Sequence, residues 1–186
     1  ARSGARGAVI SLGERPVVTE ADLPAAQDFG TFHPFIKGVF SQWHPSPFSV
    51  DGVAFSCAEQ YMMAAKASLF GDADALTRIM ASDDPALHKR LGAGVRGFDE
   101  AKWHRWRIHI VFTANHAKFS QNPGAFRQLR NTAPAMLVEA NPRDWNWGNG
   151  LQIDDPNNYD PAQWRGTNFL GRILTLVRGQ LSDAQN

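Results

Sequence analysis

Two ionisable residues of one predicted helix have the spacing and surroundings of a reactive pair. Glu59 and Lys66 are seven residues apart, close to two helical turns, so both side chains project from one face about 10 Å apart along the axis. Met62 and Met63 lie between them and make this face largely apolar. Apolar surroundings raise the pKa of a carboxyl and lower the pKa of an amine. The pair therefore predicts a general acid beside a nucleophilic lysine; the alternative is a solvated Glu and Lys on an amphipathic helix.

The loop from Asn141 to Gly150 is a second chemical signal, because Trp, Asn, Asp and Gly are interleaved in it. Trp147 supplies a flat stacking surface, Asp144 supplies hydrogen-bond acceptors, and Gly148 lets the backbone approach a ligand closely. A hydrophobic core does not need this mixture. The loop is therefore predicted to bind a ligand, and the alternative is an Asx-rich surface turn with one Trp in the core.

A third segment, residues 102–107, interleaves basic residues with Trp103 and Trp106. This composition suits base stacking combined with phosphate neutralisation. The two Trp are also three residues apart, which is typical of a core-facing helical stripe with a charged back face. We expect the structural role for most of the segment, with one of the two Trp reaching a pocket.

Other patterns predict no chemistry. Gly92 to Gly97 spells GxGxxG, but a dinucleotide site needs a strand before it, and here the preceding residues have a helical pattern. These glycines are therefore expected to end a helix. The six His are scattered without zinc-site spacing, and the one cysteine, Cys57, is expected to be a small buried side chain. We expect no metal and no cofactor.

The elements that must position these residues are predicted to be mostly helical. Ser56 to Glu59 fits a capping box, with Ser56 at the N-cap and Glu59 at N3, and opens a helix that runs to Phe70. Asp51-Gly52 predicts a turn between two short apolar stretches, and hence a hairpin. Further helices are predicted over 73–81, 84–91, 98–119 and 168–181, shorter helical or turn-like pieces over 123–131 and 134–139, and a loop over 140–166.

Length and composition fit one globular domain, since the chain has 186 residues of which 43% are hydrophobic and 20% charged. Residues 1–30 are small, polar and punctuated by proline, so we expect a flexible lead-in, followed by a single domain over 31–183. The predicted fold class is mainly α: a compact multihelical domain with a short β-hairpin or extended pieces near its N-terminal third.

Charge and hydropathy exclude several classes of protein. The net charge of +1 excludes a strongly basic coat, so a bound polyanion must be held by a local patch. No apolar run approaches the ~20 residues of a membrane span, and residues 1–10 lack the apolar core of a signal peptide. With one cysteine and no possible internal disulfide, we expect a cytoplasmic protein with no membrane partner.

Ordered blocks of the chain resemble the NADAR (YbiA-like) family over residues 32–181. The matching blocks are Gly38 to Trp43, Pro47 to Gly52, Ala58 to Ala67, Ala117 to Phe119, Leu137 to Glu139, Asp144 to Gly148 and Gly166 to Leu174. Several blocks in the same order and at fitting spacings are far more specific than any single motif. One departure is Gln42, where many members carry Asn.

The resemblance implies a mostly helical fold and N-glycosidase activity on ribosides. Some members resemble enzymes that cleave phosphorylated ribosylamino-pyrimidine intermediates of riboflavin biosynthesis, and others remove ADP-ribose from the amino group of guanine in nucleotides or nucleic acid. We expect the second activity here, because the Gln42-Trp43 sequence and the Met-rich Glu59 helix look like the stand-alone members. A non-catalytic ADP-ribose-binding module is the third alternative. A partner toxin of the DarT type is the one protein partner that the resemblance suggests.

The resemblance also implies roles for individual residues. Glu59 and Lys66 are expected to be catalytic, with Glu59 moving the proton and Lys66 trapping the opened sugar or stabilising charge. The expected substrate-binding residues are Ser41, Gln42, Trp43, Trp103, Lys118, Asp144, Trp147, Gly148 and Asn168. Trp147 and Trp103 would stack on a ring, and either Lys118 or an Arg of residues 102–107 would hold phosphate.

Overall fold

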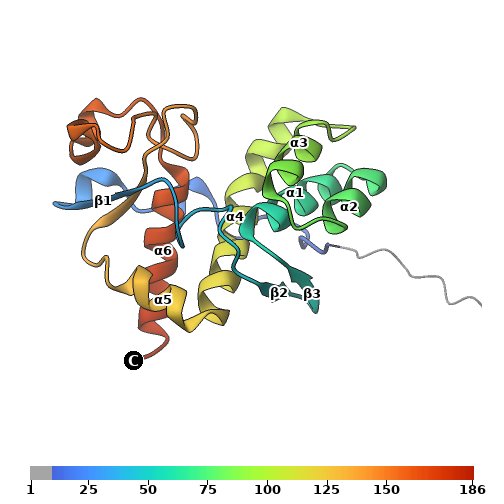
Figure 1. Cartoon of the computed structure of the whole chain (residues 1–186), viewed down its shortest axis with the longest axis horizontal. Helices are drawn as coiled ribbons and strands as arrows, with labels where there is room; N and C mark the ends of the chain where they lie inside the picture. Colours follow the sequence, from blue (N-terminus) through green and yellow to red (C-terminus); the bar gives the residue numbers. More distant parts are fainter. Residues whose placement is uncertain (1–9) are drawn as a thin grey trace, which may run out of the picture.

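A computed structural model describes residues 10–186 and is built mainly from α-helices (Figure 1). The elements are β1 (Phe32–Phe35), β2 (Phe48–Val50), β3 (Val53–Phe55), α1 (Ala58–Leu69), α2 (Ala73–Met80), α3 (Pro85–Ala93), α4 (Glu100–Gln121), α5 (Pro123–Arg130), β4 (Met136–Glu139) and α6 (Phe169–Asp183). The predicted fold class, mainly α with a hairpin in the N-terminal third, is confirmed. Within the described residues, no helix has the length and hydropathy that a membrane crossing requires.

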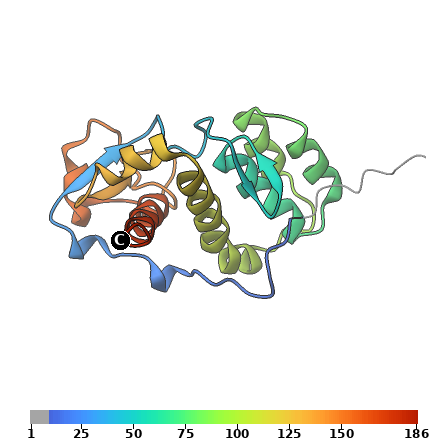
Figure 2. The same ribbon diagram turned by 90° about the horizontal axis from the view of Figure 1, so that it is seen from below.

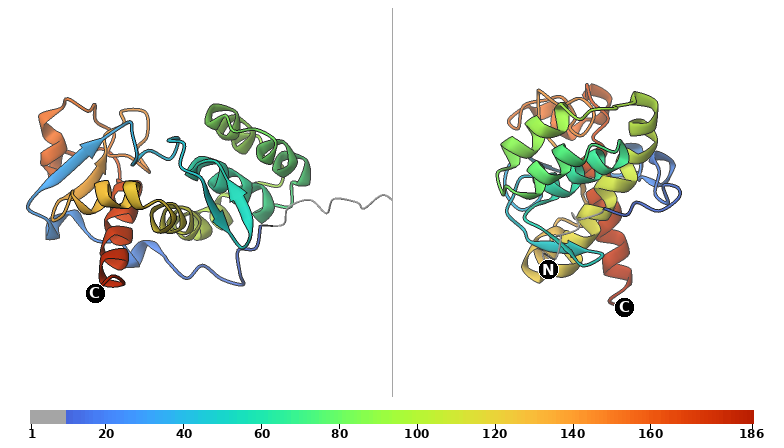
Figure 3. Two further views of the ribbon diagram at one scale, coloured as in Figure 1. Left: turned by 60° about the horizontal axis from the view of Figure 1, so that its bottom comes forward. Right: turned by 90° about the vertical axis from the view of Figure 1, so that its right-hand side faces the viewer.

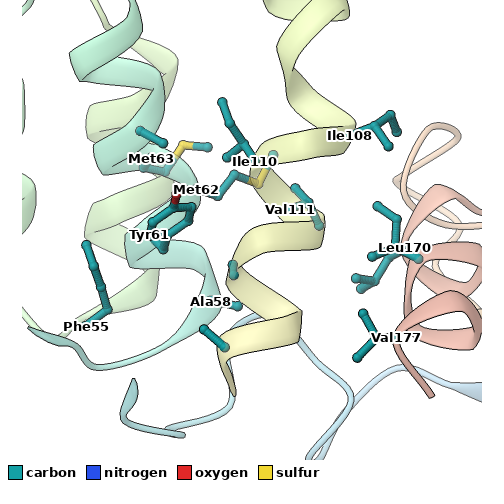
Figure 4. Close-up of a cluster of buried hydrophobic side chains, with 14 of the residues drawn as sticks. Phe55, Ala58, Tyr61, Met62, Met63, Ile108, Ile110, Val111, Leu170 and Val177 are labelled. Carbon is teal, nitrogen blue, oxygen red and sulfur yellow. The ribbon is translucent and has the colours of Figure 1, made fainter. Parts of the chain in front are cut away.

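The long helix α4 runs through the middle of the molecule. On one side lie α1, α2, α3 and the β2–β3 hairpin, and on the other lie α5, α6 and β1 (Figure 1). Figure 4 shows Met62 of α1 facing Ile110 of α4, and Leu170 of α6 facing the opposite side of α4. Trp103 and Trp106 are also buried, so the core-facing stripe expected on this helix is confirmed. The α4 helix thereby connects the two halves that surround the site.

Aspartates cap several helices. The side chains of Asp72, Asp84 and Asp99 accept hydrogen bonds from backbone N–H groups in the first turns of α2, α3 and α4, which satisfies donors that the helix leaves free. The capping box predicted for α1 is wrong by one residue, because the N-cap is Cys57 and its side chain makes no capping bond. Ser56 instead donates from N and Oγ to Gln60 Oε1 at 2.7 and 3.0 Å.

The predicted hairpin is confirmed. β2 and β3 pair antiparallel, with Phe48 opposite Phe55 and Val50 opposite Val53. The two turn residues, Asp51 and Gly52, have φ values of 51° and 78°. Both lie in the left-handed region that a two-residue hairpin turn with matching twist requires.

Residues 136–139 form a strand, which corrects the prediction of a helical or turn-like piece over 134–139. β4 pairs in parallel with β1, in register Phe32 to Met136 through Phe35 to Glu139 (Figure 3). Met136, Leu137 and Val138 are fully buried, so this short strand has no alternating polar face to reveal it in the sequence. The parallel pairing brings the carboxyl ends of both strands, and the loops that follow them, to the same edge.

Two loop predictions can be compared with the structure directly. Gly92 to Gly97 ends α3, whose last residue is Ala93 and whose C-cap is Gly94, so the glycines terminate a helix as expected. The 140–166 segment is a loop interrupted by two 3-10 turns, Pro156–Tyr159 and Pro161–Gln163. Its centre is fixed by buried Asn149, whose Nδ2 donates to Asn158 Oδ1 at 2.7 Å.

The N-terminal segment has little regular structure beyond the 3-10 turns Glu20–Asp22 and Ala26–Asp28. It crosses beneath α4 and α6 (Figure 2). Ile10 and Leu23 are buried in the core, and Arg172 Nε of α6 donates to Pro24 O at 2.9 Å. The predicted lead-in, residues 1–30, also includes residues 1–9 outside the described part, and its flexibility stays a prediction.

Candidate active site

A cleft of about 910 Å³ lies beside the start of α4. One wall comes from α1, α3 and α4, and the other comes from the end of β4 and the loops that follow β1 and β4. The side chains that line it include Lys37, Ser41, Gln42, Trp43, His44, Glu59, Met62, Met63, Lys66, Lys89, Trp103, Glu139, Asn141, Arg143, Asp144 and Trp147. The cleft therefore brings together Glu59, Lys66 and six of the nine predicted substrate-binding residues.

Glu59 lies in the first turn of α1 and is 7% exposed. Its backbone N donates to Gln42 O at 3.0 Å, which ties the helix start to the loop after β1. Burial raises the pKa of its carboxyl to about 7; Lys89 and Lys66 lower this pKa, and Asp144 raises it. A carboxyl with this pKa can both release and accept a proton near neutral pH, as general acid–base catalysis requires.

Lys66 lies two turns further along the same face of α1. Its Nζ is 4.9 Å from the ring centroid of Phe98 and 5.3 Å from that of Trp103, so aromatic rings surround the amine. Burial lowers the pKa of Lys66, and the charge of Glu59 partly opposes this effect. The predicted placement of Glu59 and Lys66 on one face, facing one site, is confirmed.

Glu139 ends β4 and is an acidic cleft residue to which the sequence analysis assigned no role. Its Oε2 is buried and has no hydrogen-bond partner among residues 10–186. Burial raises the pKa of Glu139 to about 8; Asp144 and Glu59 raise this pKa further, and Lys89 lowers it. Glu139 is the last residue of the family-like block Leu137 to Glu139. The sequence predicted a helical or turn-like piece here in place of a strand, so it gave no reason to place Glu139 in the same site as Glu59.

The loop after β4 brings Asp144 and Trp147 to the cleft, as predicted. Asp144 Oδ1 accepts from the backbone N of Asn146 at 3.0 Å and of Trp147 at 2.9 Å, an Asx turn that fixes the loop. Trp147 is half-buried and packs edge-on against Phe169, with ring centroids 6.0 Å apart. It presents an aromatic surface to the cleft, and stacking of a ligand on this surface stays a prediction.

The loop after β1 presents Ser41, Gln42 and Trp43 to the cleft. Asn115 Nδ2 donates to Val111 O at 2.9 Å and to Gln42 Oε1 at 2.8 Å. Because a backbone carbonyl can only accept, the Asn115 amide has one possible orientation, and this in turn places the Gln42 NH₂ beside Met62, a cleft residue. Gln42 therefore offers a substrate a hydrogen-bond donor.

Three predicted substrate-binding residues do not line the cleft. Lys118 is fully buried and donates from Nζ to Ser41 O at 3.0 Å, and burial lowers its pKa to about 7. Asn168 is fully buried, where its Oδ1 accepts from Glu139 N at 2.9 Å and its Nδ2 donates to Leu137 O at 3.0 Å. Gly148 packs closely against the backbone, since a Cβ at this position would lie 2.9 Å from both Asp144 O and Glu139 O. These residues support the walls of the cleft, and the predicted ligand contacts are wrong.

Cationic side chains around the cleft were also missed. Lys37, Lys89 and Arg143 line it, together with His44. They come from three segments: the loop after β1, helix α3 and the loop after β4. Because they are far apart in the sequence, no local cluster of charges predicted that they would meet. In the 102–107 segment only Trp103 lines the cleft, as expected.

Comparison with known proteins agrees with this architecture. The NADAR domain family model matches residues 31–182. Among relatives, "N-glycosidase R617" of Acanthamoeba polyphaga mimivirus is 40% identical over 75% of this chain and 85% of its own length. "N-glycosidase YbiA" of Escherichia coli is 30% identical over 78% of this chain and 82% of its own length.

Two further matches bear on fold and function. The NMR structure of E. coli YbiA superimposes with a TM-score of 0.70 and 26% identity, covering 96% of this chain and 95% of that one. A "Riboflavin biosynthesis protein VVA0006" of Vibrio vulnificus is 27% identical over 78% of this chain, but the match covers 36% of its length. The chain belongs to the NADAR domain family, several of whose members are named N-glycosidases.

Proposed function

We propose that this protein hydrolyses the N-glycosidic bond between ADP-ribose and the amino group of guanine, in a nucleotide or in nucleic acid. The observation that carries the proposal is a single cleft that holds Glu59 and Lys66 together with Trp43, Trp103 and Trp147. Acid, amine and stacking surfaces are the groups that cleavage of a purine N-riboside needs.

The size and charge of the cleft support the larger of the two candidate substrates. Its volume, about 910 Å³, is near the upper end of the range for small-molecule sites, about 300–1,000 Å³. Lys37, Lys89 and Arg143 on its walls match the charge of a diphosphate. A ribosylamino-pyrimidine monophosphate would leave much of this space and charge unused.

The chemistry follows from the two catalytic candidates. Cleavage breaks the bond between the anomeric carbon and the amino nitrogen, adds water's hydroxyl to the carbon and leaves a proton on the nitrogen. Glu59 shuttles the proton, and Lys66 either condenses with the opened sugar, releasing guanine, or stabilises charge as an ammonium group. The imine from such a condensation would then be hydrolysed to restore the free lysine.

A riboflavin-pathway glycoside is the second candidate, because the Vibrio vulnificus relative is named a riboflavin biosynthesis protein. Incubation with guanosine-linked ADP-ribose and, separately, with the ribosylamino-pyrimidine phosphate tests both, with the released base detected by mass spectrometry. We expect release from the first substrate. Release from the second alone would refute the proposal, and tight ADP-ribose binding without release would identify a binding module.

Borohydride tests the role of Lys66. Added during turnover, it should reduce an imine and leave the sugar covalently attached to Lys66, which peptide mass spectrometry can locate. The Lys66→Met variant should show no adduct, and Lys102→Met, on an exposed lysine of α4, is the matched control. Turnover without an adduct would restrict Lys66 to charge stabilisation.

A further inference from the structure

Glu139 has a carboxyl oxygen that the protein itself does not use. Its backbone is fixed on both sides: Glu139 N donates to Asn168 Oδ1 at 2.9 Å, and Glu139 O accepts from Asn149 N at 2.9 Å. Its side chain lines the cleft, and within the described part of the chain Oε2 is buried without a hydrogen-bond partner. An unpaired buried carboxyl oxygen costs stability without contributing a contact, so a purely structural role does not account for it.

The charged groups around this carboxyl come from several elements. Glu59 of α1, Lys89 of α3 and Asp144 of the following loop all act on it electrostatically. Lys37, His44, Lys66 and Arg143 also line the cleft. Two carboxyls in one enclosed site do not both ionise readily, so one of them keeps its proton at neutral pH.

The positions of the lysines decide which carboxyl keeps the proton. Lys66 lies two turns from Glu59 on the same face of α1 and lowers its pKa, whereas Glu139 enters the cleft from β4 on the other wall. Glu59 is therefore the first of the two to ionise as the pH rises. Glu139 stays protonated to a higher pH, which is what a general acid requires.

We propose that Glu139 is a second catalytic residue, the general acid that protonates the departing nitrogen, while ionised Glu59 takes the proton from the attacking nucleophile. This assignment rests on the proposed N-glycosidase function. In the step, the Glu139 O–H bond breaks as the N–H bond of the leaving amine forms, and the carbon–nitrogen electron pair goes to that nitrogen. Water, or the Lys66 amine, supplies the new bond to the anomeric carbon and gives its proton to Glu59. Exchange of protons with solvent then restores both carboxyls.

A leaving-group test separates this role from a structural one. The variants are Glu139→Gln and Glu59→Gln, with Glu100→Gln, an exposed carboxyl of α4, as the matched control. The substrates are guanosine-linked ADP-ribose and its N7-methylated counterpart, whose cationic base departs without needing a full proton. Thermal melting confirms that each variant is folded.

We expect Glu139→Gln to lower kcat/KM on the guanosine substrate by about 10²- to 10⁴-fold and to lower it far less on the methylated one. Glu59→Gln should lose activity on both, and Glu100→Gln on neither. Wild-type kcat/KM should fall as the pH rises above about 8, and this fall should be absent in Glu139→Gln. Wild-type activity in Glu139→Gln, or equal losses on the two substrates, would overturn the assignment.

A direct titration keeps the assignment testable if the substrate is wrong. Should the wild-type protein release no guanine, the proposed function fails. Carbon-13 NMR of labelled glutamate carboxyls, assigned with Glu139→Gln, still measures whether Glu139 is protonated at pH 7. A signal that titrates near pH 4 would overturn the role of Glu139 as an acid, whatever the substrate.

Discussion

Glu59→Gln should lower activity and raise stability in the same variant, because the ionised carboxyl serves the reaction but opposes folding. Gln keeps the shape of Glu and remains compatible with the first turn of a helix, so α1 should form. It neither releases nor accepts a proton at neutral pH, so kcat should fall by about 10²- to 10⁴-fold. Affinity for ADP-ribose should change little, since the lost group acts mainly in the transition state.

The gain in stability follows from the burial of Glu59. Burial raises its pKa from 4.5 to about 7, so between these pH values the folded protein holds a proton that the unfolded chain has lost. The free energy of unfolding therefore falls as the pH rises through this range. Since a tenfold change in proton affinity is worth about 1.4 kcal/mol, the ionised carboxyl destabilises the fold by up to about 3 kcal/mol at pH 8. Gln removes this penalty.

Urea denaturation at pH 8 and at pH 4.5 measures the effect. Glu59→Gln should unfold at higher urea than wild type at pH 8, and the difference should largely vanish at pH 4.5, where Glu59 is protonated in the folded state and about half protonated in the unfolded chain. Glu100→Gln, on an exposed carboxyl, should change neither stability nor activity. Equal stability of Glu59→Gln and wild type at pH 8, with full turnover, would show that Glu59 is an ordinary solvated carboxylate.

Two other substitutions distinguish cleft residues from supporting ones. Trp147→Ala should weaken ADP-ribose binding, measured by calorimetry, by about 1–3 kcal/mol for one lost stacking contact; a melting temperature many degrees lower with unchanged affinity would assign Trp147 to the core instead. Asn168→Ala should lower the free energy of unfolding by about 2–4 kcal/mol, because the backbone groups of Glu139 and Leu137 lose their buried partner. An Asn168→Ala variant as stable as wild type in urea would contradict that structural role.

The helices were predictable because each carries local signals. Aspartate caps, the glycines after α3 and the 3.6-residue periodicity of α6 all act within a few residues of the element they define. β4 carries no such signal, because a four-residue strand buried on both faces has the same apolar sequence as a buried turn of helix. Its pairing partner, β1, is about 100 residues earlier in the chain, so only the tertiary fold reveals the strand.

The site was predictable where one element supplies both partners, and not where distant segments meet. Glu59 and Lys66 share α1, so helical geometry alone placed them on one face. Glu139 reaches the cleft through the unrecognised strand β4. Lys118 had the right charge for a phosphate contact, but its position on the inner side of α4 buries the amine completely.

The polar residues that support the cleft differ in their surroundings from the acids that line it. Lys118 Nζ donates to Ser41 O, and Asn115 Nδ2 donates to Gln42 Oε1. These hydrogen bonds from α4 fix the loop after β1. The Glu59 side chain is buried, Glu139 Oε2 has no hydrogen-bond partner among the described residues, and burial raises the pKa of both carboxyls. Within residues 10–186, Asn115 Oδ1 and Glu139 Oε2 are both buried without a hydrogen-bond partner, but only the Glu139 side chain lines the cleft, where it can exchange a proton with a substrate. We therefore expect the reaction to take place between α1 and the end of β4, where these two acids line the cleft.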